Sequence, residues 1–212
     1  MNVTVITATD PLYPRGIEQR LGESPTIASL GNLDLLQSRP LALFCSINCP
    51  GDVILRTYDL VRAIRDAGVP IIGGFHSPME KECLTLLLRG TQPFLMCPAR
   101  SIEEIPPPPA CKEPLGEDRL LVLSPFTKKH RRVTADNSQR RNLFIAALAG
   151  QILVAHAGRA SKTEHLCRQV ISWGKPVWTV ASNENEHLLA IGAKPLKLED
   201  VPALAANWPH GL

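Results

Sequence analysis

Aromatic residues are scarce in this sequence, where Phe, Trp and Tyr together make up 5% of 212 residues. This scarcity disfavours a groove that binds single-stranded nucleic acid by stacking its bases on several rings. No apolar run approaches the roughly 20 residues that a membrane helix needs, so we expect no membrane contact. The N-terminal MNVTVITATD lacks a basic segment followed by a long apolar one, and we therefore expect no secretory signal.

The six cysteines lack the paired CxxC spacing of zinc sites. Several stand in apolar stretches, as buried free thiols do, so we expect a reducing, cytoplasmic location without structural metal or cofactor. Cys45 and Cys49 would be reactive near a helix N-terminus, although inert buried thiols are commoner. No Ser-His-Asp order stands out, and a lone loop histidine such as His76 is a weak candidate for a general base. The sequence therefore favours a non-catalytic protein.

A strand, a glycine pair and the start of a helix follow one another in residues 71–90, IIGGFHSPMEKECLTLLLRG. Ser77 is the expected N-cap, Pro78 takes the first helical position, and Glu80 completes a capping box. Free N–H groups and the positive end of a helix dipole converge in such a loop, which makes it a candidate anion site. The alternative is that Ser77 and Glu80 already satisfy these N–H groups.

Short apolar strands alternate with helical segments along most of the chain. This alternation predicts an α/β fold, a Rossmann-like open parallel sheet flanked by helices on both faces. Strands are expected near residues 41–45, 69–72, 94–97, 120–123, 152–155 and 176–180, and helices near 16–21, 53–67, 77–90, 138–148 and 161–173. Asp52 is the expected cap of the helix at 53–67.

Two further segments complete the predicted organisation. Residues 1–40 are expected to form an N-terminal lead-in outside the sheet, and residues 41–212 to form the Rossmann-like domain. Residues 106–114, PPPPACKEP, are too rich in proline for a helix or a central strand. We expect them to cross the surface in an extended conformation.

Ligands of parallel sheets bind where the carboxyl ends of the strands meet. Arg141 can hold a phosphate through two N–H groups, and Lys162 adds a positive charge at a helix start. A structural clamp on loop carbonyls is the alternative role of Arg141. The candidate phosphate-binding residues at this edge are Ser46, Asn48, Gly74, His76, Ser77, Arg100, Arg141, Asn142, Ser161, Lys162 and Thr163.

A basic run follows the fourth predicted strand, although the net charge of +3 is too small to indicate nucleic-acid binding by itself. Lys128, Lys129, Arg131 and Arg132 are candidate contacts to a nucleic-acid backbone. A solvated surface loop is the alternative for these four residues.

The order and spacing of these loops resemble the Rossmann-like core of the DNA-processing protein A family (DprA, also called Smf) over roughly residues 10–195. The most specific match is Arg141-Asn142 followed by FIAAL and the strand ILVA, and Gly174-Lys175-Pro176-Val177 is similar to the closing turn. The sequence departs from the family pattern at Cys45, Ile47, Leu143 and His156, and it ends without the winged-helix tail of many members. We therefore expect a divergent, minimal member.

The resemblance implies a protein that binds single-stranded DNA through phosphate contacts and acts in recombination or DNA uptake. It also implies a homodimer and the loading of a RecA-type recombinase. The alternative is a module that binds or processes a small nucleotide within the same superfamily, although the Pro-Gly-Gly-x-Gly-Thr-x-x-Glu motif of the related phosphoribohydrolases is missing. A third interpretation is a scaffold that has lost its ligand.

Overall fold

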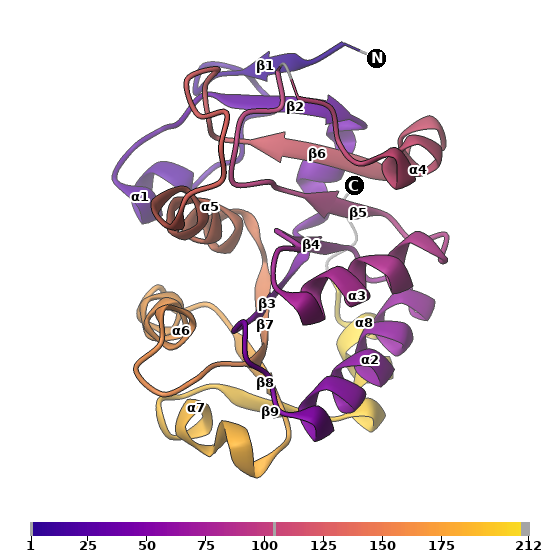
Figure 1. The fold of residues 1–212 in the computed structure, drawn as a ribbon, viewed down its shortest axis with the longest axis vertical. Helices are drawn as coiled ribbons and strands as arrows, with labels where there is room; N and C mark the ends of the chain where they lie inside the picture. The colour runs from indigo at the N-terminus through magenta and orange to yellow at the C-terminus, as the bar shows by residue number, and fades with distance from the viewer. Residues whose placement is uncertain (1, 104, 209–212) are drawn as a thin grey trace.

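One mixed sheet with helices on both faces forms the protein (Figure 1). The computed structural model describes residues 2–103 and 105–208. The nine strands lie in the order β1-β2-β6-β5-β4-β3-β7-β8-β9. They are β1 (Thr4–Ile6), β2 (Ile27–Gly31), β3 (Leu41–Cys45), β4 (Ile71–Gly73), β5 (Phe94–Met96), β6 (Leu120–Ser124), β7 (Gln151–His156), β8 (Val177–Val180) and β9 (Lys194–Leu196).

Helices of very different length connect these strands. The α-helices are α1 (Ile17–Leu21), α2 (Gly51–Asp66), α3 (Pro78–Leu88), α4 (Lys112–Gly116), α5 (Ala135–Leu148), α6 (Lys162–Ser172), α7 (Glu186–Ala190) and α8 (Val201–Ala206). Short 3₁₀ turns are η1 (Leu33–Ser38), η2 (Pro109–Cys111), η3 (Asn183–Asn185) and η4 (Leu198–Asp200).

Each strand shares its side chains between two hydrophobic layers, because successive side chains of a strand point to opposite faces. In β3, Leu41 and Leu43 pack in the layer under α2, α3 and α8. The alternate residues Ala42 and Phe44 pack in the layer under α5 and α6. Figure 1 shows these two groups of helices on opposite sides of the sheet. The predicted α/β fold with both faces covered is confirmed.

The sheet is not parallel throughout, and residues 1–40 do not lie outside it. Strand β2 pairs antiparallel with β6, and β1 pairs antiparallel with β2. The prediction that this lead-in stands apart from the sheet was therefore wrong. Strand β2 carries the polar Ser29, whose buried hydroxyl donates to the carbonyl O of Thr4. Strand β6, with which β2 pairs, lies about ninety residues further along the chain, so no local sequence pattern indicates this pairing.

Three smaller expectations also need correction. Residues 106–114 are not extended throughout, because η2 and the start of α4 lie within them. Pro109 and Pro114 stand in first turns, where a missing N–H costs no hydrogen bond. Helix α2 begins at Gly51 with Pro50 as its N-cap, so Asp52 lies in the first turn and does not cap. Strand β9 was not predicted; Pro195 within it is tolerated because β9 is an edge strand.

No helix in the described part of the chain is both long and apolar enough to span a bilayer. The division at residue 40 into two domains stays a prediction. Met1 and residues 209–212, which end the two predicted segments, lie outside the described residues, as does Glu104.

We expect Gly31→Ala to weaken the pairing of β2 with β6 by more than about 2 kcal/mol, because left-handed backbone is unfavourable for alanine. Gly31 has a φ of +110°, and an added Cβ would lie 2.2 Å from the carbonyl O of Leu120. Urea unfolding measures this loss. The matched control is Gly116→Ala in α4, where a Cβ would meet open space. Equal stability of the two variants would contradict the prediction.

Candidate functional site

The direction of chain winding reverses between β3 and β7. Strands β4, β5 and β6 follow β3 on one side, whereas β7 and β8 lie on its other side, and all of these strands are parallel. Helix α2 leaves β3 on one face of the sheet, and α6 leaves β7 on the other (Figure 1). Loops that diverge in this way open a crevice at the carboxyl ends of the strands. The loops that the sequence places together do lie along this one edge.

Arg141 of α5 is buried at this edge, with 3% of its surface exposed. Its Nη1 donates to the carbonyl O of Cys97 at 3.0 Å, and its Nε donates to Oδ1 of Asn142 at 2.7 Å. Burial lowers the pKa of the guanidinium, and the more distant Glu80 charge acts in the opposite direction. Within residues 2–103 and 105–208, Arg141 makes no ion pair. The contact with Cys97 is a clamp on a loop carbonyl, the alternative role of Arg141, and its role in phosphate binding stays a prediction.

Gly74 makes room for this guanidinium. A Cβ on Gly74 would lie 1.6 Å from Nη1 of Arg141, far inside any permitted contact. The sequence indicates a sharp turn at Gly73-Gly74. Glycine is needed at Gly74 for a different reason, which is the space taken by the Arg141 side chain. The loop after β4 and the helix α5 are mutually dependent, because the bare glycine backbone is what admits the arginine side chain.

Glu80 occupies the N–H groups that an anion would use at the start of α3. Its Oε1 accepts from the N–H of Cys45 at 2.9 Å, and its Oε2 accepts from the N–H groups of His76 at 2.9 Å and Ser77 at 3.4 Å. The N–H of Glu80 in turn donates to Oγ of Ser77, so the predicted capping box is confirmed. Of the two interpretations of this loop, the satisfied cap is the one that the structure contains.

The loops after β3 and β7 are fastened to each other. Oγ of Ser46 accepts from the N–H of Gly158 at 3.2 Å, and the N–H of Ser46 donates to the carbonyl O of His156 at 2.9 Å. Nδ1 of His156 is hydrogen-bonded to Oδ1 of Asn185 at 2.9 Å. These bonds join the loops after β3 and β7 directly and fix their relative position. Ser46 serves this fastening, and its binding role stays a prediction.

A hollow of about 360 Å³ lies between α5 and α6. Asn142 and Lys162, both predicted, line it together with His165 and Gln169, which sequence reasoning missed. Ser161 caps α6 by accepting from the N–H of Glu164 at 3.2 Å, and the exposed Lys162 and half-buried Thr163 follow. Asn142 and Lys162 thus meet at this hollow from two helices, whereas Arg141 does not line it.

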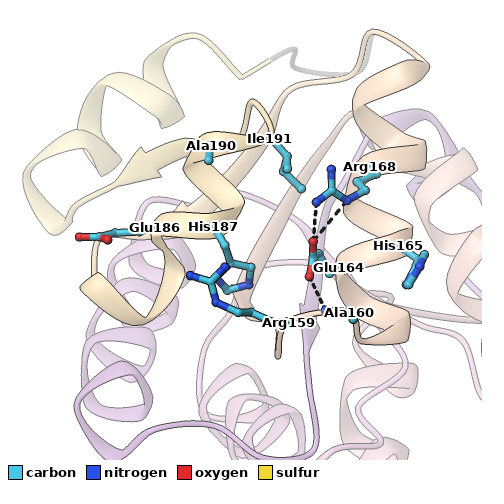
Figure 2. A pocket seen from close by; sticks show the side chains of 9 residues that line it. All are labelled: Arg159, Ala160, Glu164, His165, Arg168, Glu186, His187, Ala190 and Ile191. Atoms are coloured by element: carbon cyan, nitrogen blue, oxygen red, sulfur yellow. Dashed lines mark hydrogen bonds and ion pairs between the residues drawn. The ribbon is translucent and has the colours of Figure 1, made fainter.

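A larger pocket of about 680 Å³ lies next to it between α6 and α7 (Figure 2). Arg159 and His187 project into it, and sequence reasoning missed both residues. Nε2 of His187 is hydrogen-bonded to the carbonyl O of Ala157 at 2.8 Å. Glu164 accepts from Nη2 of Arg168 at 2.6 Å, and this bond, ahead of the N–H of Ala160, lowers the pKa of the Glu164 carboxyl.

Arg159 makes no ion pair with any residue in the described ranges, whereas Arg168 is occupied by Glu164. Arg159 could have been identified from the sequence by its position between Gly158 and Ser161, in the loop after β7. Ala160 beside it has a φ of +55°, an uncommon conformation for a non-glycine residue that concentrates at functional loops.

The predicted basic run forms the loop between β6 and α5 at the same edge. Lys128, Lys129, Arg131 and Arg132 are all exposed, and Nζ of Lys128 lies 3.6 Å from a carboxylate oxygen of Glu103. The ring of Phe126 is 2% exposed, so it cannot stack on a base. This loop offers charge without an aromatic platform.

The remaining candidates differ in what they can offer. Arg100 turns into its own loop, where Nη1 donates to the carbonyls of Ser101 and Ile105, so it acts as a clamp. Asn48 and the side chain of His76 are exposed. The Cys49 thiol and burial both raise the pKa of the Cys45 thiol, so Cys45 stays protonated near neutral pH and is no nucleophile.

The comparisons with known proteins agree with this geometry. The family model described as DNA recombination-mediator protein A matches residues 4–201. The chain belongs to this family. The resemblance predicted from the loop motifs is therefore confirmed, and with it the membership in a DNA-processing family. No curated protein sequence matches the chain.

Two solved structures of DNA processing protein A share the fold at low sequence identity. The protein from Streptococcus pneumoniae is 20% identical with a TM-score of 0.79, and the match covers 95% of this chain and 74% of that one. The protein from Helicobacter pylori, described for its single-stranded DNA binding mode, is 18% identical with a TM-score of 0.77 over 97% of each chain. The molybdenum cofactor carrier protein from Chlamydomonas reinhardtii is 12% identical with a TM-score of 0.54, covering 80% of this chain and 98% of that one.

We expect Gly74→Ala to drive the Arg141 guanidinium out of its place and to lower the free energy of unfolding by about 2–4 kcal/mol. In Gly74→Ala/Arg141→Met the clash is relieved, so the two changes should couple by at least about 1 kcal/mol. Urea unfolding of both single variants and the double variant completes the cycle. Gly158→Ala is the control, because its Cβ would meet Ser161 at 3.9 Å. Additive losses would show that Gly74 and Arg141 do not depend on each other.

Proposed function

We propose that this protein binds single-stranded DNA through its phosphates along the carboxyl edge of the sheet. The observation that carries the proposal is the buried Arg141 charge, which touches no carboxylate among the described residues and lies at the carboxyl ends of β4 and β5, beside Gly74 and Cys97. A buried guanidinium gains from a phosphate that can accept two parallel hydrogen bonds. Family membership and the single-stranded DNA binding described for the Helicobacter pylori protein support the choice of ligand.

The proposed path of the strand follows the cations of this edge, which are exposed except for Arg141. It runs from the basic loop at Lys128–Arg132 past Arg141 and Lys162 towards Arg159. These cations come from the loop after β6, from α5, from α6 and from the loop after β7. With Phe126 buried, affinity must come from phosphate contacts and not from base stacking. We therefore propose binding with little preference among sequences and a strong dependence on salt.

The second candidate ligand is a small nucleotide. The hollow lined by Asn142 and Lys162 favours it, since about 360 Å³ lies within the range of small-molecule sites, roughly 300–1,000 Å³. A nucleotide would need this hollow and Arg141 but not the basic loop. The basic loop is therefore the feature that separates the two functions.

The family resemblance also implies an oligomeric state and a protein partner. We propose a cytoplasmic homodimer that delivers its DNA strand to a RecA-type recombinase. Light scattering over a concentration series tests the dimer, and a mass that stays at one chain would exclude it. Strand exchange by a recombinase on coated DNA, with and without this protein, tests the partner.

We expect oligo-dT to bind with an affinity that falls steeply with salt, each phosphate contact contributing about 0.7 to the slope of log K against log salt. Arg141→Ala should weaken binding at least tenfold, a loss of about 1.4 kcal/mol or more. Changing Lys128, Lys129, Arg131 and Arg132 together to Glu should weaken binding and flatten the slope. Fluorescence anisotropy of a labelled strand measures both quantities.

The matched control for charge reversal is Arg89→Glu with Lys112→Glu, two exposed residues in segments that precede β5 and β6. The control should bind like the wild type. Loss of DNA binding in the Arg141 variant but not in the basic-loop variant would favour the small nucleotide. Absence of binding by the wild type at low salt would exclude the DNA proposal.

A further inference from the structure

A second concave site lies at the opposite edge of the sheet, where β3, β7 and β8 begin. This cavity of about 670 Å³ is lined by Arg39 just before β3, Gly150 just before β7 and Lys175 just before β8. Arg15 and Arg20, from the turn before α1 and from α1 itself, form another wall. The length of the parallel strands separates this cavity from Arg141, which lies at their carboxyl ends.

Four cations and no carboxylate line this cavity. Nζ of Lys175 donates to the carbonyls of Ala146 and Ala147, at 2.5 and 2.9 Å, and to that of Ala149, while Nη1 of Arg20 donates to the carbonyl of Ala147 at 3.0 Å. These two residues thus cap the end of α5. Burial, together with the Arg20 charge, lowers the pKa of Lys175 to about 7.

Arg15 and Arg39 do not cap helix carbonyls in this way. Neither side chain makes a hydrogen bond or an ion pair with a residue of the described ranges, and both residues are exposed. Two guanidinium groups with all their N–H groups available therefore face a cavity whose other charges are also positive. An anion that carries two negative charges is the complementary ligand.

The backbone of Arg39 adds an independent observation. Its φ of +46° lies in the left-handed region, which costs a non-glycine residue about 1 kcal/mol or more. Arg39 is the C-cap of η1, and a left-handed residue is a common way for a helix to end. Gly150 packs against it so closely that a Cβ on Gly150 would lie 2.9 Å from the carbonyl O of Arg39. Glycine or asparagine would fit this backbone at lower cost, yet the chain carries an arginine.

One aromatic side chain completes the lining. Trp173, at the end of α6, is half-buried and lines the cavity, so part of its indole is accessible from within. An indole offers a flat apolar face for a ring. We propose that this cavity binds a small phosphate monoester that carries a flat ring, of the class of the nucleoside monophosphates. Arg15 and Arg39 hold the phosphate, and the ring lies against Trp173.

The size of the cavity agrees with this class of ligand. About 670 Å³ is within the roughly 300–1,000 Å³ of small-molecule sites. The site is independent of the proposed DNA path, because none of its lining residues belongs to the carboxyl edge. A protein that fails to bind DNA would still bind the nucleotide here.

The test follows the indole N–H resonance of Trp173 in ¹⁵N-labelled protein during titration with AMP, the resonance being assigned with Trp173→Phe. We expect AMP to shift it in saturable fashion, and adenosine, which lacks the phosphate, to bind at least tenfold more weakly. Arg15→Ala/Arg39→Ala should weaken AMP binding at least tenfold. Arg62→Ala/Arg89→Ala, which removes two exposed arginines outside the cavity, should bind AMP like the wild type.

The comparison of AMP with adenosine uses the wild type alone, so it does not depend on how the variants fold. Equal binding of the two ligands would overturn the phosphate site. A Trp173 resonance that stays in place at millimolar AMP, or a double variant that keeps the wild-type affinity, would also overturn it. If inorganic phosphate shifted the Trp173 resonance as much as AMP does, the proposed contact between the ligand ring and Trp173 would be wrong.

Discussion

The Glu80 carboxylate joins the two loops on which the carboxyl edge depends. It accepts backbone N–H groups from the end of β3 and from the loop after β4, and it is almost wholly buried. Three N–H donors stabilise such a buried charge without any cation in contact. Arg141 therefore does not need to serve as the partner of Glu80, and no ion pair joins them within the described chain. The separation of these two charges leaves the buried guanidinium without a carboxylate partner in the described chain, and Gly74 keeps the space that it occupies.

Local patterns predict the core of this fold well because the central parallel strands are continuous apolar runs between helices. Strands such as β3 and β7 are buried on both faces, and their sequences LALFC and QILVAH show it directly. The antiparallel edge could not be predicted in this way. Strand β2 is recognisable only through its pairing with β6, which depends on the tertiary arrangement and on the close approach of Gly31 to Leu120. Edge strands such as β9 are three residues long and carry little periodicity.

The site was predictable by position but not by role. Residue type and strand order identify Arg141, Asn142 and Lys162, because loops after parallel strands must share one edge. Whether a polar group is free depends on its neighbours, and the sequence does not contain this information. Ser77 and Arg100 are occupied by their own loops, as the hydrogen bonds of Glu80 and of the Ile105 carbonyl show. Arg159 escaped notice because it has no motif, although it is an unpaired cation within the described loop after β7.

Helix α5 connects the charge distribution of the two edges. Its first turns carry Arg140 and Arg141 beside the basic loop, where the positive end of the helix dipole adds to their field. Its last carbonyls at Ala146 and Ala147 are taken by Lys175 and Arg20, so the negative end of the dipole is neutralised by cations from other elements. Both ends of α5 thus lie among positively charged side chains. At the carboxyl end these side chains neutralise the helix dipole, whereas at the amino end they add to its positive charge. At the carboxyl end of the helix the capping cations are satisfied, and the charge that remains available there belongs to Arg15 and Arg39. At the amino end the helix itself contributes, and the cations of the basic loop gain from an anion lying across it.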